Sequence, residues 1–236
     1  MIKVETLADA RAWADACAGR MVETLSSALG ETGRAVFAGA GGSTPGPIYR
    51  RIARADIDWT RVVITLVDER AVPETSPQSN AALIKRDLMS CAPAYSTFVP
   101  LFQPAVTVDR AAALASRALE IAAPRLDAVL LGMGEDGHIC SMFPGSPTLT
   151  TLLAPALKPA IFGVPRGRDG AAPDLERLSM NLPWLMTARR IVLAITGPAK
   201  RDVFEREEAG DPSTQPIAAL IAAKAPLEVV WTEAAA

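Results

Sequence analysis

The feature that most constrains the fold of this chain is a repeated alternation between short apolar runs and amphipathic segments. The apolar runs have the length and the unbroken apolar character of buried strands, and they lie at residues 35–40, 62–67, 127–131, 191–196 and 227–231. Strands that are separated by helices pair in parallel through right-handed crossovers. The sequence therefore predicts an α/β fold of the Rossmann-like type, with a doubly wound, mostly parallel sheet and helices on both of its faces.

The segments between these runs predict the helices. Apolar residues recur at helical spacing from Leu7 to Leu29 and stop at Gly30, which predicts a helix that ends at this glycine. Further helices are expected at residues 48–53, 80–89, 109–122, 198–208 and 215–223, and shorter strands at 98–101, 160–164 and 178–182. Asp109 is expected to cap its helix. Residues 144–173 are rich in Pro and Gly and show no clear period.

Composition narrows the class of protein. The chain has 236 residues, with 24 Lys and Arg against 26 Asp and Glu, and half of it is hydrophobic. Intrinsic disorder needs low hydrophobicity and high net charge, so it is excluded. A net charge of −2, without any basic run longer than a pair, gives no field that would attract nucleic acid. No linker divides the chain, and we expect a single domain over residues 1–236.

The sequence also bears on location and on metal binding. No stretch reaches the roughly 18 apolar residues of a membrane span, and the N-terminus lacks the basic start and apolar run of a signal peptide. Cys17, Cys91 and Cys140 lie far apart without CxxC spacing, and His138 is the single histidine. We therefore expect a cytoplasmic monomer or small homo-oligomer with reduced thiols, no membrane partner and no zinc site.

The first candidate site follows the first predicted buried strand. Gly41, Gly42, Ser43 and Thr44 stand between that strand and a predicted helix. Backbone N–H groups and hydroxyls at such a turn can bind an anion, because the positive end of the helix dipole adds to their attraction. The alternative is a tight turn in which Ser43 or Thr44 caps the helix and Pro45 takes its first position. The turn alone leaves both interpretations open.

The second candidate site is the glycine-rich segment 132–138, which follows another predicted strand. Its three glycines match the G-x-G-x-x-G pattern of dinucleotide binding. However, Glu135 and Asp136 would place two carboxylates beside the pyrophosphate, which is the wrong electrostatic sign. We interpret the glycines as bends that expose Asp136 and His138 at the sheet edge, where His138 can act as a general base near neutral pH. The alternative is a hydrogen-bonded loop histidine without a chemical role.

Charged residues form the third candidate group. Asp68, Glu69 and Arg70 directly follow a predicted strand, at the edge where doubly wound sheets bind their ligands. Arg177 and Lys200 stand at the start of a predicted strand and of a predicted helix, where each could hold a phosphate. The alternatives are a salt-bridged strand end and solvated surface charges. The sequence contains no G-x-S-x-G segment, so an α/β-hydrolase triad is not expected.

Taken together, these segments resemble the 6-phosphogluconolactonase family. The segments that carry the resemblance occur in the family's order and are GGSTP at 41–45, DERAVP at 68–73 with SN at 79–80, LGMGEDGH at 131–138 with SMFPG at 141–145, RLSM at 177–180 and GPAK at 197–200. They span most of the chain, from about residue 35 to about residue 205, and a similar aromatic and acidic ending follows at 231–233. The combination is specific, although each segment alone is not.

The resemblance implies a cytosolic lactonase that needs neither metal nor cofactor. Its substrate would be 6-phospho-D-glucono-1,5-lactone, hydrolysed to 6-phospho-D-gluconate in the oxidative pentose phosphate pathway, and His138 would activate the attacking water. The resemblance implies that the 6-phosphate is held by Gly41, Gly42, Ser43, Thr44, Arg177 and Lys200, and that Asp68, Arg70 and Asn80 line the sugar-facing side. The candidate catalytic residues are His138, Asp68, Arg70 and Asp136. A reactive cyclic ester needs a positioned water, a base and charge stabilisation, which agrees with this set.

Two other functions stay open. The related amino-sugar-phosphate isomerising deaminases share a Gly-His loop, but their loop continues with a Phe-Asn-Glu-Pro segment whose glutamate supports the histidine. The corresponding residues here are 141–144, which include no carboxylate. A non-catalytic sugar-phosphate sensor would need only the phosphate-binding residues, so His138 argues against it. Departures from the family pattern are Cys140, Ser179 and Thr232, where alanine, threonine and a bulkier apolar residue are usual.

Overall fold

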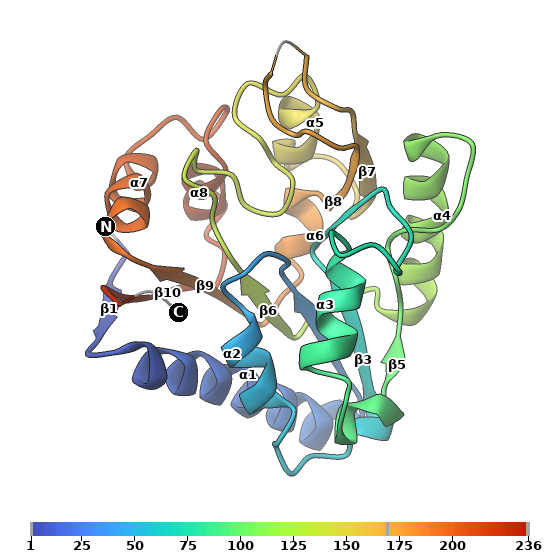
Figure 1. Ribbon diagram of the computed structural model, residues 1–236, viewed down its shortest axis with the longest axis vertical. Helices are drawn as coiled ribbons and strands as arrows, with labels where there is room; N and C mark the ends of the chain where they lie inside the picture. The colour runs from blue at the N-terminus through green and yellow to red at the C-terminus, as the bar shows by residue number, and fades with distance from the viewer. Residues whose placement is uncertain (1, 169, 235–236) are drawn as a thin grey trace.

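The computed structural model describes residues 2–168 and 170–234 (Figure 1). The strands of its main sheet are β1 (Val4–Leu7), β2 (Ala35–Gly39), β3 (Val62–Leu66), β5 (Thr97–Phe98), β6 (Ala128–Leu131), β9 (Arg190–Thr196) and β10 (Leu227–Thr232). Within the described residues they are ordered β1-β10-β9-β6-β2-β3-β5, and every pairing is parallel. The predicted doubly wound, mostly parallel α/β fold is therefore confirmed.

Helices cover the sheet. They are α1 (Ala10–Thr32), α2 (Gly46–Ile52), α3 (Asn80–Asp87), α4 (Val108–Ala122), α5 (Leu149–Leu153), α6 (Leu182–Leu185), α7 (Pro198–Glu208) and α8 (Pro216–Ala222), with the short 3-10 helices η1 (Trp59–Arg61) and η2 (Ala92–Tyr95). Figure 1 shows α1 along one side of β9 and β10, with α7 and α8 on the other side. Trp13 on α1 and Phe37 on β2 are fully buried between these layers. Burying such a side chain contributes about 1.5–3 kcal/mol.

A second, smaller sheet departs from the sequence prediction. It consists of β4 (Asp68–Arg70), β8 (Arg177–Met180) and β7 (Ile161–Val164) in that order, and both of its pairings are antiparallel. The chain runs from β3 through Val67 directly into β4, which the sequence did not predict as a strand of its own. The strand predicted at 178–182 is β8, and Leu182 instead begins α6. As a consequence of this pairing, Arg70 lies directly opposite Arg177.

Other element boundaries also differ from the predictions. The first helix ends at Gly33, whose φ of +72° suits a glycine C-cap, and Gly30 stays inside the helix. The four-residue edge strand β1 precedes it and has no apolar run that would predict it. Thr107 caps α4 by accepting a hydrogen bond from the helix backbone, so the expected cap at Asp109 is wrong. The strand β5 is shorter than the predicted range 98–101.

The strand order determines where a ligand can bind. From β2 the chain proceeds outward through β3 to β5, whereas β6, on the other side of β2, leads to β9 and β10. The direction in which successive strands are added to the sheet therefore reverses between β2 and β6. Doubly wound sheets bind their ligands at such a point, in the crevice beyond the carboxyl ends of the strands. Segments 41–44 and 132–138 are the ones that leave these two strands. The structure thus brings two of the candidate sites to one crevice.

Candidate active site

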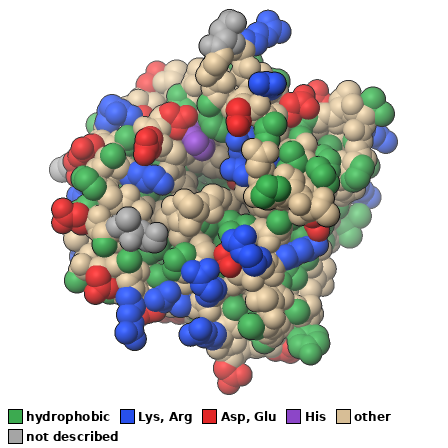
Figure 2. Space-filling model, in the orientation of Figure 1, with side chains coloured by type: hydrophobic (Ala, Val, Ile, Leu, Met, Phe, Trp, Pro, Cys, Tyr) green, Lys and Arg blue, Asp and Glu red, His purple; other side chains and the backbone are tan. Residues whose placement is uncertain are grey.

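A pocket of about 190 Å³ opens beyond the carboxyl ends of β2 and β6. Its lining residues are Ala40, Gly41, Gly42, Ser43, Thr44, Asp68, Arg70, Asn80, Gly132, Met133, Gly134, His138, Cys140, Arg177 and Lys200. They include every predicted binding residue and every predicted catalytic residue except Asp136, which instead contacts His138. Figure 2 shows the histidine at the edge of a hollow on this face, with acidic and basic side chains around it.

The loop between β2 and α2 presents bare backbone and free hydroxyls to the pocket. A Cβ at Gly41 would lie 1.9 Å from Asn80 Oδ1, so the Asn80 amide can lie against this backbone only because residue 41 is glycine. The alternative interpretation, in which Ser43 or Thr44 caps the helix, is wrong, because no side chain caps α2. In the part of the chain that the structure describes, neither hydroxyl has a protein partner. Both are therefore available to a ligand.

Asp68 is a buried carboxylate that joins three parts of the pocket. The amide of Asn80 donates to its backbone oxygen at 3.0 Å and to its Oδ1 at 3.2 Å. The Ser141 hydroxyl donates to its Oδ2 at 2.6 Å, and the Ser141 N–H in turn donates to Ser179 Oγ at 3.2 Å. These bonds fix the carboxylate at the pocket wall. Ser141 is a positioning residue to which the sequence analysis assigned no role.

Glu69 organises the start of α3, and sequence reasoning also gave it no role. Its carboxylate accepts hydrogen bonds from the backbone N–H groups of Arg70, Asn80 and Ala81 and from the Ser79 hydroxyl, at 2.7–3.0 Å. Burial raises the pKa of Glu69, and these hydrogen bonds oppose that rise. A carboxylate at a helix N-terminus satisfies donors that would otherwise be unpaired. Glu69 therefore places Asn80 against Asp68.

Arg70 and Arg177 form a pair of cations beside the pocket. They lie opposite each other on β4 and β8, and the Nε of each is buried without a hydrogen-bond partner. The Arg177 side chain is 12% exposed, and burial followed by repulsion from Arg70 lowers its pKa. Buried donors without a hydrogen-bond partner, on two like charges that face each other, are costly. Such a pair fits a ligand that carries a negative charge and several acceptor oxygens.

The single histidine is held by a neighbouring carboxylate. Asp136 Oδ1 lies 2.5 Å from His138 Nδ1 and also accepts the His138 backbone N–H at 3.2 Å. Burial opposes ionisation of Asp136, but the hydrogen bonds from His138 outweigh it and lower the pKa of Asp136. Because Nδ1 is occupied, Nε2 is the nitrogen free for proton transfer. A Cβ at Gly134 would lie 2.2 Å from Nδ1, so this arrangement requires glycine there.

Lys200 and Cys140 complete the pocket wall. Lys200 lies in the first turn of α7, and within the described residues its ammonium forms no ion pair. Cys140, which the sequence analysis did not place in the site, has a φ of +51°, a conformation that few non-glycine residues adopt. Burial, and then the charge of Asp68, raise the pKa of its thiol well above the usual value. The thiol is therefore a neutral part of the wall.

Glu207 supports the histidine loop from behind. Its side chain is buried on α7, and a Cβ at Gly137 would lie 2.6 Å from Glu207 Cδ. Gly137 has a φ of +89°, so both its conformation and its contact require glycine. Burial raises the pKa of Glu207, Arg206 opposes this rise, and the charge of Asp136 adds to it.

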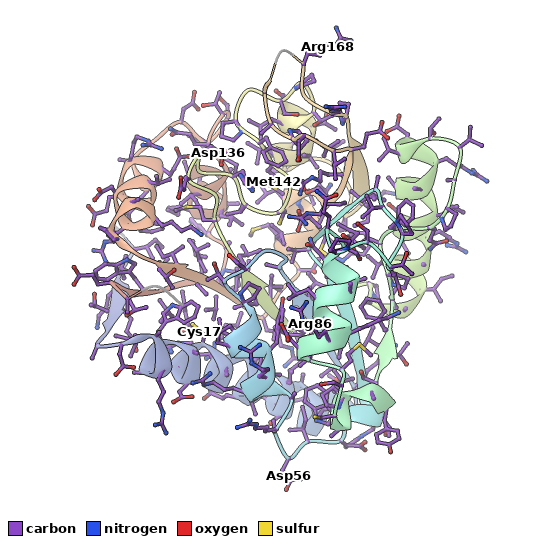
Figure 3. The ribbon with its side chains drawn as sticks, in the orientation of Figure 1. Cys17, Asp56, Arg86, Asp136, Met142 and Arg168 are labelled. Atoms are coloured by element: carbon purple, nitrogen blue, oxygen red, sulfur yellow. The ribbon has the colours of Figure 1, made fainter. Side chains whose placement is uncertain are left out.

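Figure 3 shows Asp136 in the loop near α7 and α8, whereas Cys17 lies on α1 at the other side of the sheet.

We expect Glu207→Gln to be more stable than the wild type at pH 8, and its advantage to shrink toward pH 4. A carboxyl whose pKa is raised by folding contributes stability below its ordinary pKa and loses it as pH rises through the folded pKa. Glutamine does not ionise, so it avoids this loss. Urea unfolding of both proteins across this range measures the effect. Glu205→Gln on the same helix is the exposed control, and an equal pH dependence in Glu207→Gln and wild type would contradict the account.

Among the described residues, no group of three or more His, Cys, Asp or Glu side chains is placed to hold a metal ion. None of the described helices is both long and apolar enough to cross a membrane.

Comparison with known proteins identifies the family. A profile of glucosamine-6-phosphate isomerases/6-phosphogluconolactonase matches residues 8–231. The chain is 38% identical over 232 residues to 6-phosphogluconolactonase of Caulobacter vibrioides, covering 98% of each chain. It is 40% identical over 226 residues to that of Rhizobium meliloti, covering 93% of this chain and 94% of the relative. The crystal structure of a 6-phosphogluconolactonase from Shewanella baltica has a TM-score of 0.90 at 29% identity and covers 98% of both chains. The chain therefore belongs to the family of glucosamine-6-phosphate isomerases and 6-phosphogluconolactonases.

Proposed function

We propose that this pocket hydrolyses 6-phospho-D-glucono-1,5-lactone to 6-phospho-D-gluconate, as a step of the oxidative pentose phosphate pathway. The observation that carries the proposal is that one pocket contains both a carboxylate-held histidine and two arginines with unpaired Nε donors. The first group suits proton transfer to and from water, and the second suits a phosphate. The relatives named 6-phosphogluconolactonase, at 38–40% identity over nearly the whole chain, support the same activity.

The phosphate of the substrate binds among the basic residues. Arg177 and Lys200 supply charge, and the backbone and hydroxyls of residues 41–44 supply neutral donors. Arg70, which the family resemblance assigned to the sugar-facing side, lies beside Arg177 and contributes its own unpaired Nε. Asp68 and Asn80 face the sugar hydroxyls. Binding at the phosphate holds the lactone carbonyl near the histidine, which lowers the entropic cost of reaction.

His138 then performs the proton transfers. Its Nε2 takes a proton from water as the water oxygen bonds to the lactone carbonyl carbon, and the carbonyl becomes an oxyanion. When the carbonyl reforms, the bond between C1 and the ring oxygen breaks, and the imidazolium gives its proton to that oxygen. The product is an open-chain acid with a free hydroxyl. Asp136 keeps the imidazole in the competent orientation and stabilises its cationic form.

The runner-up functions receive less support from the residues. The carboxylate that holds His138 is Asp136, upstream of it, and residues 141–144 lack the glutamate of the isomerising deaminases. A sensor that only binds sugar phosphates would not need the hydrogen bond between Asp136 and His138.

We further propose that the protein acts in the cytoplasm as one domain, a monomer or small homo-oligomer, without nucleic acid or membrane partners. The net charge of −2 gives no field that would attract nucleic acid, which supports the absence of that partner.

We expect exhaustive chelation with EDTA to leave lactone hydrolysis unchanged, because the proposed chemistry uses water, a base and fixed charges. The acid released from freshly prepared 6-phosphogluconolactone, corrected for spontaneous opening, measures the rate. In the same preparation, glucosamine 6-phosphate is expected to release no ammonia. Activity lost on chelation and restored by a divalent ion would contradict metal independence. Steady ammonia release with no lactone turnover would move the protein to the deaminase class.

A further inference from the structure

One aromatic ring contacts both the histidine base and an arginine of the proposed phosphate-binding group. The Phe143 ring centroid lies 4.3 Å from that of His138, with the two planes at 37°. The Arg177 guanidinium carbon lies 5.7 Å from the same centroid. The Phe143 side chain is 3% exposed, so the ring is enclosed between its neighbours. In the sequence, Phe143 had only a place within a family segment and no role of its own.

The backbone around Phe143 is held by turns. Met142 N donates to Ile139 O at 3.0 Å, and Ser146 N donates to Phe143 O at 3.0 Å. Gly145 takes a φ of +78° in the second of these turns, a conformation suited to glycine. The neighbouring Ser141 is anchored on Asp68. Figure 3 shows Met142 further along the same strand-to-helix connection as Asp136, within the body of the molecule. The ring therefore has a fixed place relative to the pocket.

We infer that Phe143 is a specificity-determining positioning residue, which sets the separation between the histidine base and the phosphate-binding arginine. This inference rests on the proposed lactonase function. An aromatic face attracts a guanidinium and stacks on an imidazole, and a flat, rigid ring has little freedom to change the distance between them. A substrate reacts only when its phosphate-to-carbonyl distance matches that separation. The pocket should therefore select phosphorylated aldonolactones by carbon number.

The inference predicts a preference that depends on the ring. Wild type should prefer 6-phosphogluconolactone to a seven-carbon aldono-1,5-lactone 7-phosphate, in which one more carbon separates the lactone ring from the phosphate. Aromatic contacts of this kind correspond to factors of about 2 to 30 in an equilibrium or rate. We expect Phe143→Leu to lower kcat on the six-carbon substrate about tenfold and to reduce the six- over seven-carbon preference in kcat/KM at least about threefold. Phe143→Tyr keeps the ring and should retain most of both.

A matched control exists on β5, an edge strand of the main sheet. Phe98 on β5 also has a cation over its ring, with Lys85 Nζ 5.1 Å from the centroid, but it does not line the pocket. Phe98→Leu should therefore leave kcat and the carbon-number preference as in wild type. If Phe143→Leu fails to fold, Phe143→Met, whose flexible side chain fills irregular gaps without a ring, takes its place in the comparison.

A second measurement is independent of turnover. Because the chain has a single histidine, its imidazole C–H signal in a proton NMR spectrum belongs to His138. The ring current of Phe143 should displace this signal in wild type, in Phe143→Tyr and in Phe98→Leu, and the displacement should be lost in Phe143→Leu and Phe143→Met. If the signal of folded wild type is not displaced, the Phe143 ring does not lie against His138, and the inference is wrong.

The outcomes separate this inference from the proposed function. Wild type without any turnover of 6-phosphogluconolactone would overturn both, because the proposed function itself would fail. Normal turnover by wild type, together with an unchanged carbon-number preference in Phe143→Leu and Phe143→Met, would overturn the role of Phe143 alone. A reduced preference in these two variants, its retention in Phe143→Tyr and a wild-type value in Phe98→Leu would establish the role.

Discussion

Replacing His138 by Asn is expected to lower the enzymatic rate of lactone hydrolysis by about 10²–10⁴. The asparagine amide can still donate a hydrogen bond to Asp136, so the loop keeps its main contact. The asparagine side chain cannot accept a proton from water, so only the binding and charge effects of the pocket remain. The initial rate of acid release, after subtraction of the spontaneous reaction, measures the change.

The control for this variant is Glu120→Gln, which removes an exposed carboxylate on α4 that does not line the pocket. It should retain nearly the full rate. If His138→Asn also keeps near wild-type turnover, the base lies elsewhere, and the buried carboxylate of Asp68 becomes the first candidate.

Removing the phosphate-binding charges is expected to change KM more than kcat. A charge-assisted hydrogen bond contributes about 1.5–3 kcal/mol, so Arg177→Ala and Lys200→Ala should each raise KM about ten- to a hundredfold. The phosphate is remote from the reacting carbonyl and is bound alike in the ground and transition states, so kcat should change less. Steady-state kinetics with 6-phosphogluconolactone give both constants.

The matched control is Arg201→Ala. Arg201 follows Lys200 on α7, pairs with Glu205 and lies over the Trp231 ring, but it does not line the pocket. Its KM should stay near that of wild type. Unchanged KM in both Arg177→Ala and Lys200→Ala would remove the phosphate from this part of the pocket.

Most of the main sheet could be predicted, because β2, β3, β6, β9 and β10 contain continuous apolar runs. Every residue of β2 and β6 is buried, and burial on both faces leaves a pattern that a single sequence displays. The second sheet could not be predicted in this way. Its strand β4 consists of Asp68, Glu69 and Arg70, whose charged side chains have no apolar period, and its pairing partner β8 lies more than a hundred residues later in the chain. Only the tertiary structure places them together.

In the candidate site too, some residues could be predicted from the local sequence, and others only from tertiary contacts. His138, Arg177 and Lys200 could be named from sequence because they stand next to element ends and match family segments. The supporting residues Glu207 and Phe143 could not, because their roles depend on contacts across the chain. A glutamate inside a helix and a phenylalanine in a loop are common in protein sequences, and neither indicates a site by itself. Glu207 is informative only once its burial against Gly137 is known, and Phe143 only once its ring is seen beside His138 and Arg177.

The most direct test of the central claim, that one part of the pocket binds phosphate and another transfers protons, is calorimetric binding of 6-phosphogluconate to two variants. His138→Asn removes the base and leaves the basic residues in place, so its dissociation constant should stay within a fewfold of wild type. Arg177→Ala removes a bond to the phosphate and should weaken binding about ten- to a hundredfold. The opposite pattern, with binding lost in His138→Asn and kept in Arg177→Ala, would contradict the account.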